Sequence, residues 1–204
     1  LHYYIRAPKV DQMFQLFERV NKVAAGAATM TETEMEYHVI DGFSDYVPNK
    51  TLSTLMAQCM AELGAPAFTD ADRALAAQFA GTVGTEERKD NLESDCADNE
   101  LPYSYFDGKV LHEEPLPLCY NPRRPSPGST DVGDVSYCTP TAQCTMATMA
   151  LGTGGHTWQM TAQSNSSIGD KGMLAAAKVM ALTAVRAAAD PALLQAARTE
   201  WQAT

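Results

Sequence analysis

The sequence has no uninterrupted apolar run of the roughly 20 residues that cross a bilayer, and no basic-then-apolar secretion signal opens it. It also has no excess of basic residues. The formal net charge is −10, whereas a phosphate backbone requires a positive surface. We therefore expect neither a membrane nor a nucleic acid among its partners. With 204 residues, 45% of them hydrophobic and 20% charged, the chain has the composition of a folded globular protein, which excludes a disordered tail, a fibre or a coiled coil.

Paired cysteines are also missing. The five cysteines are odd in number, and no two of them have the C-x-x-C spacing of a redox or zinc motif. A secreted disulfide framework favours an even set, so we expect a reducing, cytoplasmic environment. Cys138 and Cys144 lie in apolar stretches, where a thiol most often fills space in a core.

The common catalytic motifs are absent as well. The sequence has no H-E-x-x-H, no Walker-type G-x-x-x-x-G-K, no G-x-G-x-x-G after a strand and no G-x-S-x-G elbow. A nucleophile at Ser129 or Cys144, paired with His156, can be written down, but no further pattern supports it. A metal-independent hydrolase is therefore the weakest of the hypotheses considered.

Alternating strand and helix patterns predict an α/β fold. The opening HYYIR and the alternating residues 32–39 predict strands, with a helix between them that Asp11 would cap. Because the chain opens inside a strand-like run, we expect polypeptide to be missing before it. Pro48 separates this first stretch from the remainder.

The remainder predicts further helices and two short strands. Thr69 and Asp72 have the spacing of a capping box, and Pro191 suits the first position of a terminal helix. Residues 84–128 lose periodicity, first acidic and then proline-rich, and predict a long loop. The helices are expected at residues 50–63, after Thr69, at 171–188 and from Pro191, and the strands at 131–138 and 142–149.

Two segments combine residue types that could carry chemistry. The first, GSTDVGD at residues 128–134, offers hydroxyls for a carboxylate or phosphate, although the same residues also form plain turns. The second, GTGGH at residues 152–156, places an imidazole in a turn where a ligand can approach it. A lone histidine is more often a satisfied surface or core group, so both interpretations stay open from the spacing alone. His112, beside Glu113 and Glu114, is a weaker candidate for holding a cation.

The block GSTDVGDVSYCTPTAQCTMATMALGTGGHTWQ at residues 128–159, followed by an alanine-rich helix, closely resembles the C-terminal end of metal-dependent amidohydrolases acting on aminobenzoyl-glutamate. These belong to the metallopeptidase superfamily of carboxypeptidase G, aminoacylase and succinyl-diaminopimelate desuccinylase. HYYIRAP and FERVNKVAAGAATMTET resemble the second half of its lid or dimerisation domain. The resemblance covers essentially the whole chain. It implies that residues 1–48 are half of an α+β lid and residues 49–204 the C-terminal part of a zinc-peptidase-like catalytic domain.

The resemblance also implies roles for individual residues. His156 matches the metal-ligating histidine of the family, with zinc or manganese as the expected divalent cofactor. Arg6 matches a lid arginine that can bind a substrate carboxylate, or is a surface residue of the strand. The expected substrate is an N-acyl or N-aroyl amino acid such as aminobenzoyl-glutamate. The remaining candidates for substrate contact are Ser129, Thr130, Asp131 and Asp134.

The superfamily's other metal ligands, bridging acid and catalytic glutamate lie in its N-terminal half, and no motif here matches them. The resemblance therefore implies a C-terminal portion with no catalytic residue of its own, inactive alone. The alternative is a non-catalytic dimerisation or assembly module, in which the strand edge at residues 1–6 pairs with another chain. Both hypotheses predict a homodimer or a partner subunit.

Overall fold

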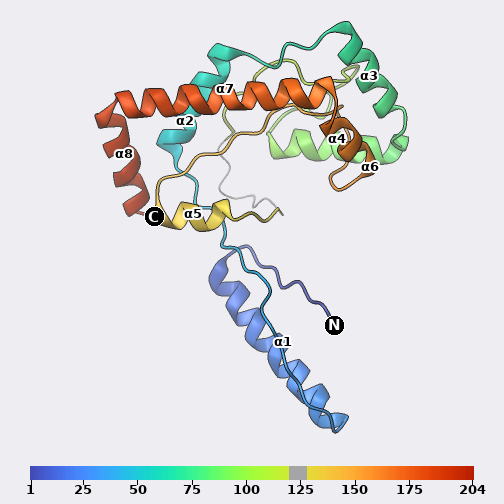
Figure 1. Cartoon of the computed structure of the whole chain (residues 1–204), viewed down its shortest axis with the longest axis vertical. Helices are drawn as coiled ribbons and strands as arrows, with labels where there is room; N and C mark the ends of the chain where they lie inside the picture. Colours follow the sequence, from blue (N-terminus) through green and yellow to red (C-terminus); the bar gives the residue numbers. More distant parts are fainter. Residues whose placement is uncertain (120–127) are drawn as a thin grey trace. The chain divides into compact units, whose positions relative to one another are not determined.

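A computed structural model of the chain describes residues 1–119 and 128–204. The described residues form two compact units. One contains residues 1–48, 128–141 and Thr204, and the other contains residues 49–119 and 142–203. The regular structure of both units is helical (Figure 1).

The expected α/β fold is wrong for the described part of the chain, which has eight helices and no strand. Residues 1–6, 32–39 and 142–149 are non-helical, as the sequence indicates, but none of these segments pairs with another in a ladder. A strand is stabilised by hydrogen bonds to a neighbouring strand, so an extended segment without that neighbour does not become one. Residue alternation predicts which side chains share a face but cannot supply the neighbour.

The first unit contains the predicted helix α1 (Val10–Met30). Its N-cap is Lys9 rather than Asp11, which lies in the first turn. The N-terminus is satisfied instead by Asp45, whose carboxylate accepts hydrogen bonds from the Val10 amide at 3.0 Å and from Lys9 Nζ at 2.7 Å. Burial raises the pKa of Asp45, but these bonds outweigh it and the net shift is downward.

The second helix of this unit, α5 (Val132–Cys138), replaces the strand expected at residues 131–138. A Cβ on Gly133 would lie 2.1 Å from the Ser44 carbonyl oxygen, so the backbone of α5 directly contacts the backbone at Ser44. The Val47 amide donates to the Ser136 hydroxyl at 2.9 Å. Gly133 and Ser136 are three positions apart, so they share one face of a helix but would lie on opposite faces of a strand. Their contacts with Ser44 and Val47 on one side therefore favour the helix.

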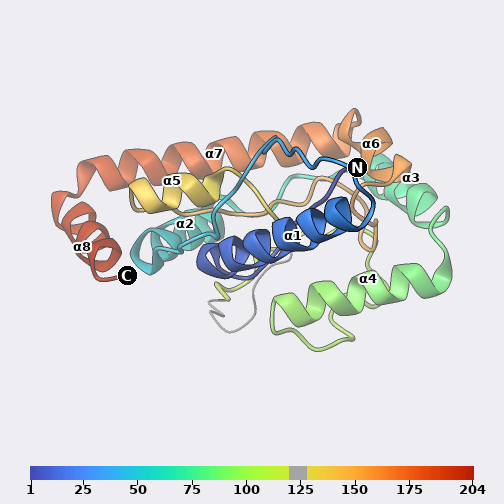
Figure 2. The same cartoon turned by 90° about the horizontal axis from the view of Figure 1, so that it is seen from below.

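In the second unit the longest helix, α7 (Ser167–Ala189), contacts four others. Both views show α8 at its C-terminal end and α3 and α6 near its N-terminal end (Figures 1 and 2). It begins four residues before the predicted start because Ser166 caps it. Its partners are α2 (Lys50–Leu63), α3 (Asp70–Ala80), α6 (Trp158–Ser164) and α8 (Pro191–Gln202).

Three predicted helix starts are confirmed. The Asn49 side chain caps α2, and its Nδ2 also donates to the Ala197 carbonyl of α8 at 2.8 Å. Thr69 and Asp72 form the predicted capping box of α3. Pro191 occupies the first turn of α8, where a missing amide hydrogen costs nothing.

The loop expected at residues 84–128 is wrong for its first part, which forms α4 (Thr85–Asp98). Only Cys96 of this helix is buried, and most of its other residues are polar. The helix therefore shows no apolar repeat in its sequence. Residues 99–119 are irregular, and the prolines Pro122, Pro125 and Pro127 of the expected loop lie outside the described residues. Phe106 and Leu151 join Cys96 in a buried cluster.

The described residues include one helix, α7, that is long and apolar enough to cross a membrane by length and composition. Charged residues interrupt its sequence, so it contains no continuous apolar run of that length. Only 22% of the most apolar stretch of α7 is buried, so it is not an ordinary enclosed core helix.

Candidate functional site

The glycine-rich turn at residues 152–156 is held against α4. Gly152 has a φ of +79°, and a Cβ on it would lie 2.6 Å from Cγ of Arg88. Only glycine suits both the backbone conformation and this close approach. The Asn91 side chain donates to the Gly152 carbonyl oxygen at 3.1 Å. A helix that replaces part of the expected loop therefore fixes the turn.

His156 closes this turn in a left-handed conformation, with a φ of +58°. Such a φ is uncommon for a residue with a side chain and persists where the surroundings fix it, often at functional sites. Thr157, the next residue, caps α6 and also donates to the Gly154 carbonyl at 2.8 Å. His156 is exposed, so its imidazole is open to a ligand.

His156 suits the predicted role of one metal ligand, because an accessible imidazole is a common donor to zinc and manganese. Within residues 1–119 and 128–204, no three His, Cys, Asp or Glu side chains come together as a metal site. An acidic group does lie beside the turn: Oε1 of Glu87 is 3.5 Å from where a Cβ on Gly154 would stand. His156 can offer one ligand position, and its role as a metal ligand remains a prediction.

Glu87 and Asn91 are residues near this turn that the sequence analysis missed. They are four apart in α4 and therefore lie on one helix face. That spacing was the available signal. It was obscured by the acidic composition of residues 86–100, which predicts a solvated loop.

In the other unit, the structure brings two predicted substrate-binding residues together. The Arg6 guanidinium donates a hydrogen bond to the Ser129 hydroxyl at 3.1 Å, although 123 positions separate them in sequence. Both residues are exposed. A guanidinium beside a hydroxyl is a donor set suited to a carboxylate.

The other three candidates in this unit lie at the start of α5. The Thr130 hydroxyl donates to the Asp131 carboxylate at 3.2 Å and accepts from the Val132 amide. Oδ1 of Asp134 accepts from the Ser44 amide at 3.2 Å. These contacts shape the first turn of the helix, and the substrate contacts of the three residues remain predictions.

The thiol alternative gains nothing from the structure. Burial raises the pKa of Cys144, whereas a nucleophilic cysteine needs a lowered pKa because the thiolate is the reactive form. The Ser129 hydroxyl accepts a hydrogen bond from a cation, Arg6, and such a contact does not make it a stronger nucleophile.

The weaker candidate for a cation site, around His112, is disfavoured because its two carboxylates form ion pairs with other side chains. Glu113 pairs with Arg73 and Glu114 with Lys109, each at 2.6 Å. Nε2 of His112 is buried and has no hydrogen-bond partner among the described residues, and burial lowers the pKa of this histidine. The two carboxylates are therefore committed to other cations.

The most strongly perturbed carboxylate among the described residues is Asp72, at the start of α3. Hydrogen bonds from Lys171 and Ser167 of α7, and then from Thr69, hold its pKa far below the ordinary value. The Asp72 side chain is 2% exposed. Perturbed groups often mark functional sites, but here every partner belongs to a helix start, which indicates a structural link between α3 and α7.

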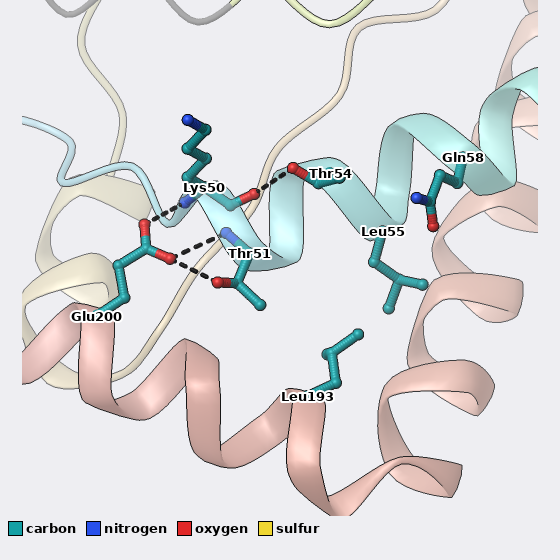
Figure 3. A pocket seen from close by; sticks show the side chains of 7 residues that line it. All are labelled: Lys50, Thr51, Thr54, Leu55, Gln58, Leu193 and Glu200. Atoms are coloured by element: carbon teal, nitrogen blue, oxygen red, sulfur yellow. Dashed lines mark hydrogen bonds between the residues drawn. The ribbon is translucent and has the colours of Figure 1, made fainter.

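A pocket of about 380 Å³ lies between α2 and α8 (Figure 3). Glu200 of α8 lies at one end, where its carboxylate accepts from the amides of Lys50 and Thr51 and from the Thr51 hydroxyl. This carboxylate already occupies the position that an anion would take at the N-terminus of α2. Leu55 and Leu193 supply the apolar wall.

Over nearly its whole length the chain is similar to part of a bacterial hydrolase. That relative is a subunit of the p-aminobenzoyl-glutamate hydrolase of Escherichia coli (strain K12), and the two are 38% identical over 204 residues. The match covers 98% of this chain and 42% of the relative, so the chain spans less than half of the relative's length. It confirms the resemblance stated for residues 128–159 and the opening segment. No family model matches the chain, and no solved structure matches it significantly.

Proposed function

We propose that this chain is the C-terminal portion of a metal-dependent amidohydrolase cleaving the amide bond of an N-acyl or N-aroyl amino acid such as aminobenzoyl-glutamate. The observation that carries the proposal is the 38% identity to a hydrolase subunit of E. coli. The exposed, left-handed His156 supports it, because the geometry keeps an imidazole accessible in a fixed turn.

In this proposal each unit of the chain has a separate task. His156 holds one position on a divalent metal, and polypeptide outside this chain provides the other ligands and the catalytic base. When bound, the metal supplies polarisation of the amide carbonyl and a water that is nucleophilic at neutral pH. Arg6 and Ser129 bind the free carboxylate of the substrate and so orient its amide. The chain alone is therefore inactive.

A chimera tests the proposal. This chain replaces the matched 42% of the E. coli relative, and the release of p-aminobenzoate and the metal content are measured against the intact relative. His156→Ala is expected to lower metal content and turnover together. His38→Ala is the matched control, because His38 is exposed and pairs with the equally exposed Glu36. An unchanged metal content in His156→Ala rejects the ligand role, and a chimera without hydrolysis, beside an active relative, rejects the substrate.

A second candidate function is a non-catalytic assembly module. It is favoured by the relative's description as one part of a multi-subunit hydrolase and by the exposed Tyr3 and Tyr4 in the extended opening segment. Light scattering after size exclusion, at several concentrations, tests it. A strict monomer that also fails to associate with the E. coli relative's unmatched portion counts against an assembly role.

A further inference from the structure

We infer that the exposed face of α7 is an interface, and that it is covered by the part of the complete protein that this chain lacks. This inference rests on the proposed function in one respect: the chain is taken as the C-terminal portion of a longer protein.

The inner side of α7 packs within its own unit. Ile168, Val179 and Ala187 are buried there, and Ile168 and Ala187 belong to two separate hydrophobic clusters of the unit. A Cβ on Gly172 would lie 2.3 Å from the Ala147 carbonyl oxygen, so the helix crosses residues 142–149 in backbone contact. One side of the helix therefore already has its partners.

The opposite side is largely apolar and is open, with the exposed Asp170 at its N-terminal end and the exposed Lys178 beside Leu174. Four large side chains on it are more than half exposed: Met173 at 60%, Leu174 at 56%, Met180 at 52% and Val185 at 65%. A predominantly apolar stripe on a helix is normally buried against another part of the protein. Scattered exposed apolar residues are common on surfaces, but four on one helix face form a contiguous patch, which is typical of an interaction site.

The small residues of this face lie along its centre. Ala177, Ala181 and Ala184 follow the i, i+4, i+7 spacing of a single line, and all three are exposed. The large side chains border this line on both sides. We define these three alanines and the four large side chains as the outer face of α7. Its centre would let another backbone approach closely while the borders enclose it.

Among possible occupants, a lipid bilayer fits poorly. Two ion pairs link α7 to neighbouring helices: Lys171 with Asp72 of α3, and Arg186 with Glu62 of α2 at 2.7 Å. Insertion of α7 into a bilayer would break both pairs. An unpaired charge is costly in hydrocarbon. The net charge of −10 also opposes approach to an anionic membrane.

The missing polypeptide fits better. The match covers only 42% of the relative, so more than half of that protein's length is available to pack on this chain. An apolar face must be buried against another element, and the described residues of the second unit pack on the inner side of α7. The outer face thus has the composition of an internal surface of a larger domain.

Thiol labelling tests the inference. Ala181→Cys places a thiol in the centre of the outer face, and Ala196→Cys is the matched control on an exposed position of α8. Maleimide labelling is followed at each site by peptide mass spectrometry, in the isolated chain and in the chimera with the E. coli relative. We expect labelling at position 181 to slow at least tenfold in the chimera and labelling at position 196 to stay unchanged. Equal rates at position 181 would overturn the inference.

Two further conditions identify a different occupant. Slower labelling of the isolated chain at position 181 as its concentration rises shows a second copy, and slower labelling with phosphatidylcholine–phosphatidylglycerol vesicles shows lipid. Either result overturns the inference. A second variant guards against misfolding of the chimera: Ala181→Glu should lower the melting temperature of the chimera but not of the isolated chain, with Ala196→Glu neutral in both. If the chimera does not fold, the isolated chain is labelled with the relative's unmatched portion added separately, and lack of protection overturns the inference.

The readout also separates this inference from the proposed function, because labelling requires neither metal nor turnover. Protection at position 181 in a chimera that hydrolyses nothing retains the interface and rejects the activity. Hydrolysis by a chimera in which position 181 stays open does the reverse.

Discussion

Lys171 of α7 donates a hydrogen bond to the buried carboxylate of Asp72, and this ion pair joins the N-terminal parts of α7 and α3. Ser167 donates to the other oxygen of the same carboxylate. Asp72 also completes the capping box with Thr69. One side chain therefore starts its own helix and anchors the longest helix of the chain.

Removing this charge should destabilise the second unit. Asp72→Asn leaves Lys171 without its counter-ion and weakens the cap, so we expect a loss of about 3 kcal/mol in unfolding free energy, measured by urea denaturation. Asp70→Asn is the matched control in the same helix turn, because the Asp70 side chain is fully exposed and its pair with Arg73 contributes little. Equal losses in both variants would show that the buried pair is not special.

The same carboxylate predicts a pH dependence. Its pKa in the folded chain lies far below the ordinary 3.8, so on acidification the unfolded chain takes up the proton first. The stabilisation is therefore complete above about pH 5 and is lost as the pH falls through 3.8 toward the folded pKa. Denaturation midpoints between about pH 2.5 and about pH 6 should decline at the acidic end, and Asp72→Asn should flatten part of that decline. A slope identical in the two proteins contradicts the assignment.

Gly133 predicts a backbone effect in the first unit. A Cβ there would lie 2.1 Å from the Ser44 carbonyl oxygen, so Gly133→Ala should displace α5, at a cost of about 1–3 kcal/mol. Hydrogen exchange of the amides in α5 should accelerate. Gly26→Ala is the control: no atom lies within 4 Å of the added Cβ, and α1 should gain about 0.5–1 kcal/mol from the better helix former. Unchanged exchange in α5 would mean that the close approach is not required.

Under the proposed function, Arg6 predicts a kinetic effect in the chimera. If its guanidinium binds the substrate carboxylate beside Ser129, Arg6→Ala in the chimera should raise KM for aminobenzoyl-glutamate about tenfold, with kcat changed much less. Arg19→Ala, at an exposed position of α1, controls for the loss of positive charge. A KM that rises equally in both variants indicates only general electrostatic attraction.

The parts of the fold that the sequence predicts are those with a local cause. Thr69 and Asp72 predict the start of α3, because a capping box involves only residues close in sequence. Pro191 announces α8 for the same reason. The 3–4-residue apolar repeat likewise predicts α1 without knowledge of the segments that pack against it.

The segments predicted in the wrong conformation are those whose state depends on distant residues. The sequence predicts a short strand at residues 131–138, but these residues form α5, in which Gly133 and Ser136 contact residues 44–47. Residues 85–98 look like a solvated loop, yet Cys96 joins a buried cluster with Phe106 and Leu151 and the segment is α4. Polarity alone cannot show that one side of a segment has found a partner.

The candidate site divides in the same way. The resemblance names His156, Ser129 and Arg6 position by position, in the glycine-rich turn, in the GSTDVGD segment and in the opening segment. Only tertiary structure could place Arg6 against Ser129, 123 positions away, or hold the histidine turn against Asn91 of α4. The residue types of a candidate site can be identified from short stretches of sequence. Hydrogen bonds between distant segments form only when the chain folds, so the sequence alone does not predict them.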